Sequence, residues 1–285
     1  MDFVVAAPAF PIDDRYDTVV ELCESLDRIW NAPAGAAWEL NLQNCGYLGP
    51  DAAALVYATY LNARISGRPG TVRLPDKPAA LDAFNHFSGL KHLLHGGKRP
   101  NRDHPDCQTV PLNHFYQAVG NQADPILTLV RRHTTLSKDA EFYLGSSFAE
   151  VVQNIEDHAG SPIGGVSCAR YFSGSNQVRV AVVDMGDGIA NTLSRKLGRI
   201  DAVEALRLVV RGRVTSQSTE RNQGLGISNL AGAVANTGGE LMILSGLGAA
   251  QVSSKAREGE YTVLPIRFPG TGVFFKMNLD EHRWT

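Results

Sequence analysis

The sequence predicts an α/β protein in two parts, and three observations lead to that prediction. Strand-like and helical segments alternate through the first 110 residues, as in parallel strands covered by helices. A segment around 148–159 turns apolar residues to one side and polar residues to the other. Short apolar runs separated by turn residues then indicate a mixed, mainly antiparallel sheet. We therefore expect one domain over residues 1–110, a linker over 111–125 and a second domain over 126–285.

The first domain is expected to have β-α-β-α order. Residues 38–42 alternate in the manner of a strand, and a turn rich in glycine and proline follows. Residues 52–64 are rich in alanine and predict a helix that ends near Gly67. Residues 71–74 predict a second strand, and residues 79–94 predict a second helix. This order implies parallel strands with helical cover.

This order of elements, with Phe87-Ser-Gly89-Leu90 near the closing helix, resembles the STAS domain of anti-sigma-factor antagonists. The resemblance covers about residues 1–110 and implies a regulatory or docking role. Those antagonists carry a phosphorylatable serine in the turn before the helix. Here the turn is Tyr47-Leu-Gly-Pro-Asp51, which has no serine or threonine, so we do not expect a phosphorylation substrate of that type.

Histidines and cysteines offer one candidate metal site. Five such residues gather in or near a glycine-rich and basic stretch: His92, His95, His104, Cys107 and His114. These residue types bind zinc, but their spacing fits no standard finger, so a surface linker is favoured and a metal site is the alternative. The four cysteines are scattered without a C-x-x-C pair, which suits reduced thiols.

The helix predicted around residues 148–159 carries the main candidate site. Four polar residues recur at i, i+4, i+7 and i+8, on one stripe: Glu150, Asn154, Asp157 and His158. The other side is apolar, with Phe148, Val151, Val152, Ile155 and Ala159. The alternative is structural: Ser147 and Glu150 have the spacing of a capping box, which would make Glu150 a helix-start residue and leave Asp157 and His158 in solvent.

Glycine motifs follow this helix in order. The apolar run 178–183 predicts a buried strand that ends on Asp184, whose carboxylate could accept a hydrogen bond from the exocyclic amine of adenine. Gly186 and Gly188 come next and allow a sharp turn and a close approach to a flat base, although a plain turn is the alternative. Further on, the start of a helix at Gly224-Leu225-Gly226 suits phosphate binding. Gly270-Thr271 either approaches the ligand or forms a simple hairpin turn.

Taken together, these motifs resemble the nucleotide pocket of the GHKL, or Bergerat-fold, superfamily, which includes gyrase, sensor histidine kinases and anti-sigma-factor serine kinases. The resemblance covers about residues 126–285 and implies an α/β sandwich that binds ATP and Mg²⁺ under a mobile lid over residues 189–223. It implies that Asn154 is the magnesium ligand, that Glu150 is the general base and that Asp184, Gly186 and Gly188 recognise adenine. The other residues that it places at the nucleotide are Asp157, His158, Gly224, Leu225, Gly226 and Thr271.

The expected reaction is ATP hydrolysis or phosphorylation of a protein serine or threonine. Histidine autophosphorylation is disfavoured, because His133 has no acidic neighbour and Pro111 and Pro125 interrupt the stretch before it. A non-catalytic ATP-dependent switch and an interaction module are the alternatives. Asn222, which stands where sensor kinases usually have another glycine, is the best support for the interaction module.

The composition of the chain limits which kinds of partner and which location we expect. The net charge of −2 gives no reason to expect nucleic acid or an anionic membrane as a partner. No apolar run reaches membrane-spanning length, and the first residues lack the pattern of a signal peptide, so we expect a cytoplasmic protein. A protein partner or substrate is expected, and a homodimer is left open.

Overall fold

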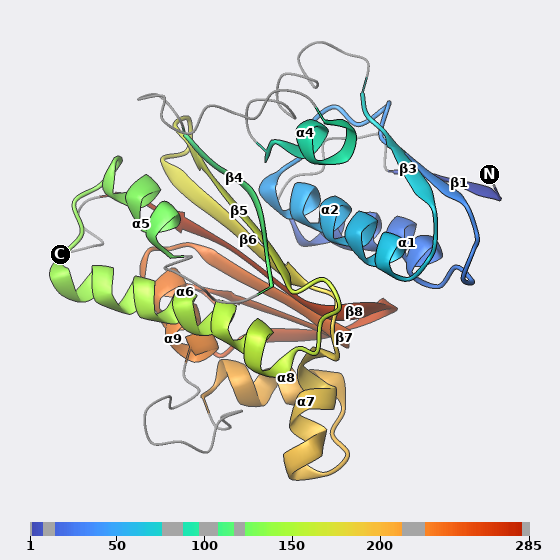
Figure 1. Cartoon of the computed structure of the whole chain (residues 1–285). Coiled ribbons are helices and arrows are strands. Elements are labelled where there is room, and N and C mark those ends of the chain that lie inside the picture. The colour runs from blue at the N-terminus through green and yellow to red at the C-terminus, as the bar shows by residue number, and fades with distance from the viewer. Residues whose placement is uncertain are drawn as a thin grey trace.

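The computed structural model describes residues 2–7, 15–75, 88–96, 108–116, 123–212 and 226–280. Within these ranges the chain forms a three-stranded sheet, a five-stranded sheet and helices that cover both (Figure 1). The fold is α/β, as the sequence predicts.

The smaller sheet is parallel and comes from the N-terminal part of the chain. Its strands are β1 (Phe3–Ala6), β2 (Trp38–Asn41) and β3 (Gly70–Arg73), in that spatial order. Parallel neighbours require crossover connections, which here are α1 (Tyr16–Trp30) and α2 (Pro50–Ile65). The predicted strands and first helix correspond to β2, α2 and β3, whereas β1 and α1 were not predicted. Of the predicted helix 79–94, residues 79–87 lie outside the described residues, and α4 (Leu90–His95) forms its end.

The larger sheet has the order β4-β5-β6-β8-β7 and is antiparallel throughout. Its strands are β4 (Thr109–Phe115), β5 (Gly165–Phe172), β6 (Gln177–Asp184), β7 (Glu240–Ser253) and β8 (Glu260–Asn278). Residues 111–115, which we assigned to a linker, belong to β4 because their backbone pairs with β5.

Gly270 lies inside β8 instead of forming a hairpin turn. β8 is one long strand, and it pairs with β7 on both sides of Gly270. The pairing register shifts near Gly246, and Gly270 has φ +82°. Because glycine adopts positive φ without steric cost, the strand can bend there and continue.

Helices α5 (Asp124–Arg131), α6 (Lys138–His158) and α9 (Gly226–Asn236) cover one face of the larger sheet, with α7 (Gly188–Leu197) and α8 (Ala202–Val210) at its end (Figure 1). The predicted apolar side of α6 is confirmed, since all five of its residues are buried. The capping-box alternative is wrong. Ser137 caps α6 by accepting a hydrogen bond from the Ala140 N–H at 3.2 Å, so Ser147 and Glu150 lie in the middle of the helix.

Helices α1 and α2 lie against the opposite face of the larger sheet, between it and the smaller sheet (Figure 1). Residues 50–59 of α2 are all buried, and the alanines among them (Ala52, Ala53, Ala54 and Ala58) let two layers approach the helix closely. One continuous core includes Trp38 and Leu55 from the N-terminal part and Ala181 and Phe268 from the larger sheet. The boundaries at 110 and 126 stay a prediction.

Candidate functional site

A small hollow lies between α6, α7, α9 and the larger sheet. It encloses about 80 Å³. Most of its wall is aliphatic, from Val151, Ile155, Val182, Leu193, Ile227 and Val273. Its polar groups come from Asn154, Asp184, Thr192 and Thr271. An apolar wall with a few fixed polar groups is typical of a site for a flat organic ligand.

Asp184 is the buried acid of this hollow. It ends β6 and is only 3% exposed. The Gly186 N–H donates a hydrogen bond to its Oδ1 at 2.8 Å, and the backbone of Thr271 also hydrogen-bonds to the carboxylate. Burial nevertheless raises the pKa of Asp184 to about 7, because a charged carboxylate is poorly solvated there. Near neutral pH, this group can therefore either accept or donate a hydrogen bond in the hollow.

Glycines let the backbone close tightly around Asp184. A Cβ on Gly186 would lie 1.9 Å from the carbonyl oxygen of Ala159, at the end of α6. A Cβ on Gly270 would lie 2.4 Å from the carbonyl oxygen of Asp184. Gly188 has φ +76° and itself lines the hollow. A Cβ on Gly188 would lie 2.9 Å from Ser245 Oγ and 3.0 Å from the Gly270 carbonyl oxygen, so the protein's own atoms fill the space at all three glycines.

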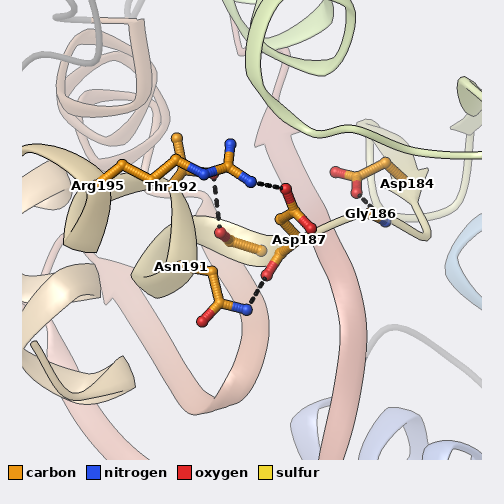
Figure 2. A network of polar contacts seen from close by, with 7 residues as sticks. Asp184, Gly186, Asp187, Asn191, Thr192 and Arg195 are labelled. Carbon is orange, nitrogen blue, oxygen red and sulfur yellow. Dashed lines mark hydrogen bonds and ion pairs between the residues drawn. The ribbon is translucent and has the colours of Figure 1, made fainter. Parts of the chain in front are cut away.

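Asp187 holds the first turns of α7 in place (Figure 2). Its carboxylate forms an ion pair with Arg195, and its carbonyl accepts a hydrogen bond from Asn191 Nδ2 at 2.8 Å. Thr192 Oγ1 donates to the Gly188 carbonyl at 3.0 Å. These contacts fix the start of α7 relative to the loop that follows Asp184.

Ser245 is a structural residue of the site that the sequence analysis did not assign to it. Its buried hydroxyl accepts a hydrogen bond from the Ile189 N–H at 2.9 Å and donates one to the Gly270 carbonyl at 3.0 Å. It thereby ties α7 to β8 beside Thr271. The partners lie 56 and 25 residues away in the chain, so no local pattern could have indicated this role.

The four residues of the polar stripe of α6 do not all lie at the hollow. Asn154 lines the hollow. Glu150 is half-buried and packs against the start of α9, since a Cβ on Gly226 would lie 2.6 Å from its Cδ. Asp157 is exposed and accepts a hydrogen bond from Gln153 Nε2 at 3.0 Å, away from the hollow. The side chain of His158 lies outside the described residues.

The structure brings some of the predicted site residues together and leaves others outside the described residues. Asn154, Asp184, Gly188 and Thr271 meet around the hollow, and Gly226 and Glu150 lie together beside it. Gly224 and Leu225 lie outside the described residues, as does Asn222. The segment predicted as a lid over 189–223 is helical from Gly188 to Leu197 and from Ala202 to Val210.

The candidate metal site finds no support within the described ranges. His95 Nε2 is 3.0 Å from the Val72 carbonyl, and His114 Nε2 is 2.6 Å from the Ile163 carbonyl. No group of three metal-binding side chains occurs in the described part of the chain, while His104 and Cys107 fall outside it.

Among the described helices, none has the length and apolarity needed to span a membrane.

Comparison with known proteins finds a weak likeness to solved structures. No family model matches the chain, and no curated protein matches it. The chain is similar to the topoisomerase IV ATP-binding domain of Francisella tularensis in complex with a small molecule inhibitor, with 13% identity and a TM-score of 0.28. The match covers 62% of this chain and 43% of that chain. At this TM-score the likeness assigns no family, and the resemblance of residues 1–110 to STAS domains finds no support.

Proposed function

We propose that this protein binds ATP, with its adenine ring in the hollow beside Asp184. The position of Asp184 is the observation that carries the proposal. Asp184 is buried in a mostly aliphatic wall and accepts hydrogen bonds from two backbone groups. A carboxylate has acceptor capacity beyond two hydrogen bonds, and the exocyclic amine of adenine supplies a further donor. Guanine has a carbonyl oxygen at that position and would meet the carboxylate as a second acceptor.

The phosphates of the nucleotide would lie beyond the hollow, which encloses only about 80 Å³. The first turn of α9 begins beside Glu150, and its free N–H groups and positive dipole end favour phosphate there. Gly224 and Leu225 immediately precede that turn in the sequence. The triphosphate is therefore assigned to the region in front of the N-terminus of α9, next to Glu150.

Asn154 would bind Mg²⁺ that is also held by the phosphates. Its side-chain oxygen is a hard, neutral ligand at the rim of the hollow, and Mg²⁺ is commonly held by one or two protein oxygens together with substrate phosphates and water. When bound, the ion would neutralise charge on the triphosphate.

The proposed reaction transfers the γ-phosphoryl group to water or to a protein serine or threonine hydroxyl. Glu150 lies one helical turn from Asn154 and is half-buried beside Gly226. Its carboxylate would take the proton from the attacking oxygen while the bond from the γ-phosphorus to the bridging oxygen breaks and ADP leaves.

A second candidate function is an ATP-dependent switch without turnover. It is favoured by one observation: Glu150 packs against Gly226 and is not among the residues that line the hollow. In that case, bound ATP would change the position of α9 relative to α6 and so alter the surface that a partner contacts.

Thermal unfolding tests nucleotide binding. We expect Mg²⁺ with ATP to raise the melting temperature, because a ligand that binds only the folded state stabilises it by about 2.7 kcal/mol at a concentration of 100 times Kd. Mg²⁺ with GTP is the matched control and should raise it much less. No shift with millimolar ATP would contradict the proposal.

Phosphate release separates the two candidate functions. Glu150→Ala should keep the ATP-induced shift and lose at least tenfold in turnover, in line with removal of a general base. Glu156→Ala is the control, because Glu156 is exposed on the same helix and does not line the hollow. Unchanged turnover in Glu150→Ala would exclude Glu150 as the base. A wild-type protein that binds ATP without releasing phosphate would favour the switch.

A further inference from the structure

A second, larger hollow lies on the other side of α7. It measures about 540 Å³ and is bounded by the start of α7, the connection from α7 to α8, and the β7–β8 pair. Ala190 and Asn191 face this hollow, whereas Ile189, Thr192 and Leu193 face the smaller one. This division follows helical periodicity, because Thr192 and Leu193 lie three and four positions after Ile189 and so share its side of the helix.

The wall of the larger hollow contains two arginines and two aspartates, and they differ in whether they have partners. Arg199 and Arg267 line it and are exposed, and within the described ranges neither forms an ion pair. The acidic side chains in the same wall already have partners. Asp187 pairs with Arg195, and Asp201 accepts a hydrogen bond from the Glu204 N–H at 2.8 Å as the cap of α8. The two arginines are thus available to an anionic group from outside.

Apolar side chains lie in the same wall. Leu247 is 45% exposed and Val263 is 71% exposed. The sheet is irregular beside them: pairing jumps from Gly246 with Phe268 to Gly248 with Val263, so residues 264–267 have no paired residue on β7. This β-bulge carries Arg267 to the rim of the hollow beside the two exposed side chains.

We propose that this hollow is a docking site for an acidic segment of a partner protein. Carboxylates of the segment would pair with Arg199 and Arg267, whose guanidinium groups suit bidentate contacts. An apolar side chain of the segment would cover Leu247 and Val263, which explains why large aliphatic groups are exposed next to cations. The proposal concerns a different surface from the nucleotide site and does not depend on ATP binding.

Selection from a random peptide library tests the proposal on the full chain. Twelve-residue peptides displayed on phage would be panned against the immobilised protein, and the enriched sequences would be synthesised and their Kd values measured. We expect enriched peptides to combine aspartate or glutamate with large aliphatic residues. Their affinity should fall at least tenfold in the Arg199→Glu/Arg267→Glu protein and in the Leu247→Ser/Val263→Ser protein.

The matched control is Lys255→Glu/Arg257→Glu, which makes the same change in net charge at exposed positions outside the hollow. It should retain the affinity of the wild-type protein. The melting temperature without ligand, measured on every variant, checks folding. The ATP-induced shift, measured separately, keeps the two proposals distinct. Failure to enrich acidic peptides, or equal weakening in the control, would overturn the docking site whether or not ATP binds.

Discussion

At the scale of single residues, the candidate site depends on Asp184 and the groups that surround it. The resemblance to the GHKL pocket assigned Asp184, Gly188, Asn154 and Thr271 to one predicted site, and all four line the hollow. The sequence analysis could not identify Ser245, whose function depends on contacts made only in the folded chain. It also could not show that Gly186 packs on α6, since close backbone approach is a property of tertiary structure.

Replacing Asp184 with asparagine should weaken ATP binding by tenfold or more and leave the protein folded. Asparagine keeps the size of the side chain and can still accept the hydrogen bond from Gly186, but it loses the charge that attracts the adenine amine. Isothermal calorimetry with Mg²⁺ and ATP measures the effect, and Asp201→Asn serves as the control at a helix cap away from the hollow. Unchanged affinity for ATP would show that Asp184 does not contact the base.

Stability should depend on pH through Asp184. Its pKa is raised from 3.8 to about 7 in the folded protein, so the folded state favours the neutral acid. The resulting stabilisation is full below about pH 4 and is lost as the pH rises through about 7. Between pH 5 and pH 8, the wild type should lose on the order of 2 kcal/mol relative to Asp184→Asn in urea unfolding. Equal pH profiles for the two proteins would contradict the raised pKa.

At the scale of elements, helical periodicity was the most reliable guide. The five apolar residues of α6 were predicted as one side and are all buried. Element boundaries were harder to predict. The start of α6 lies ten residues before Ser147, at the Ser137 cap, and β8 continues through Gly270 because its pairing with β7 outweighs a local turn signal. Long-range pairing of this kind has no counterpart in a local sequence window.

Gly186→Ala tests the contact between the loop after Asp184 and the end of α6. The new Cβ would lie 1.9 Å from the Ala159 carbonyl oxygen, and backbone atoms on both sides leave little room for adjustment. We expect a loss of about 3 kcal/mol in the free energy of unfolding, at the upper end for overpacking. Gly174→Ala is the matched control, since nothing lies within 4 Å of a Cβ there. Similar stabilities for the two variants would refute the close contact.

At the scale of the whole molecule, α1 and α2 join the two sheets into layers. Local patterns predicted α2 as a helix, but they could not show that both its sides are covered. Alanine is found both in buried helices and on exposed ones, so its alanines alone do not show which sides are covered. The decisive observation is the shared core, in which Trp30 meets Phe268 of β8 edge to face at 5.5 Å between ring centroids.

This shared core predicts that the N-terminal part and the larger sheet unfold together. Separating the layers would expose the buried surface of α2 and of β5, β6 and β8 to water, which links the two parts energetically. Fluorescence of Trp30 and Trp38, measured in a Trp284→Phe protein to remove the third tryptophan, reports on the first part. Hydrogen exchange of β6 and β8 amides reports on the second. Both probes should give the same midpoint in urea. Weakening the contact with Phe268→Ala should lower the two midpoints by the same amount. Separate midpoints would instead support independent domains over residues 1–110 and 126–285.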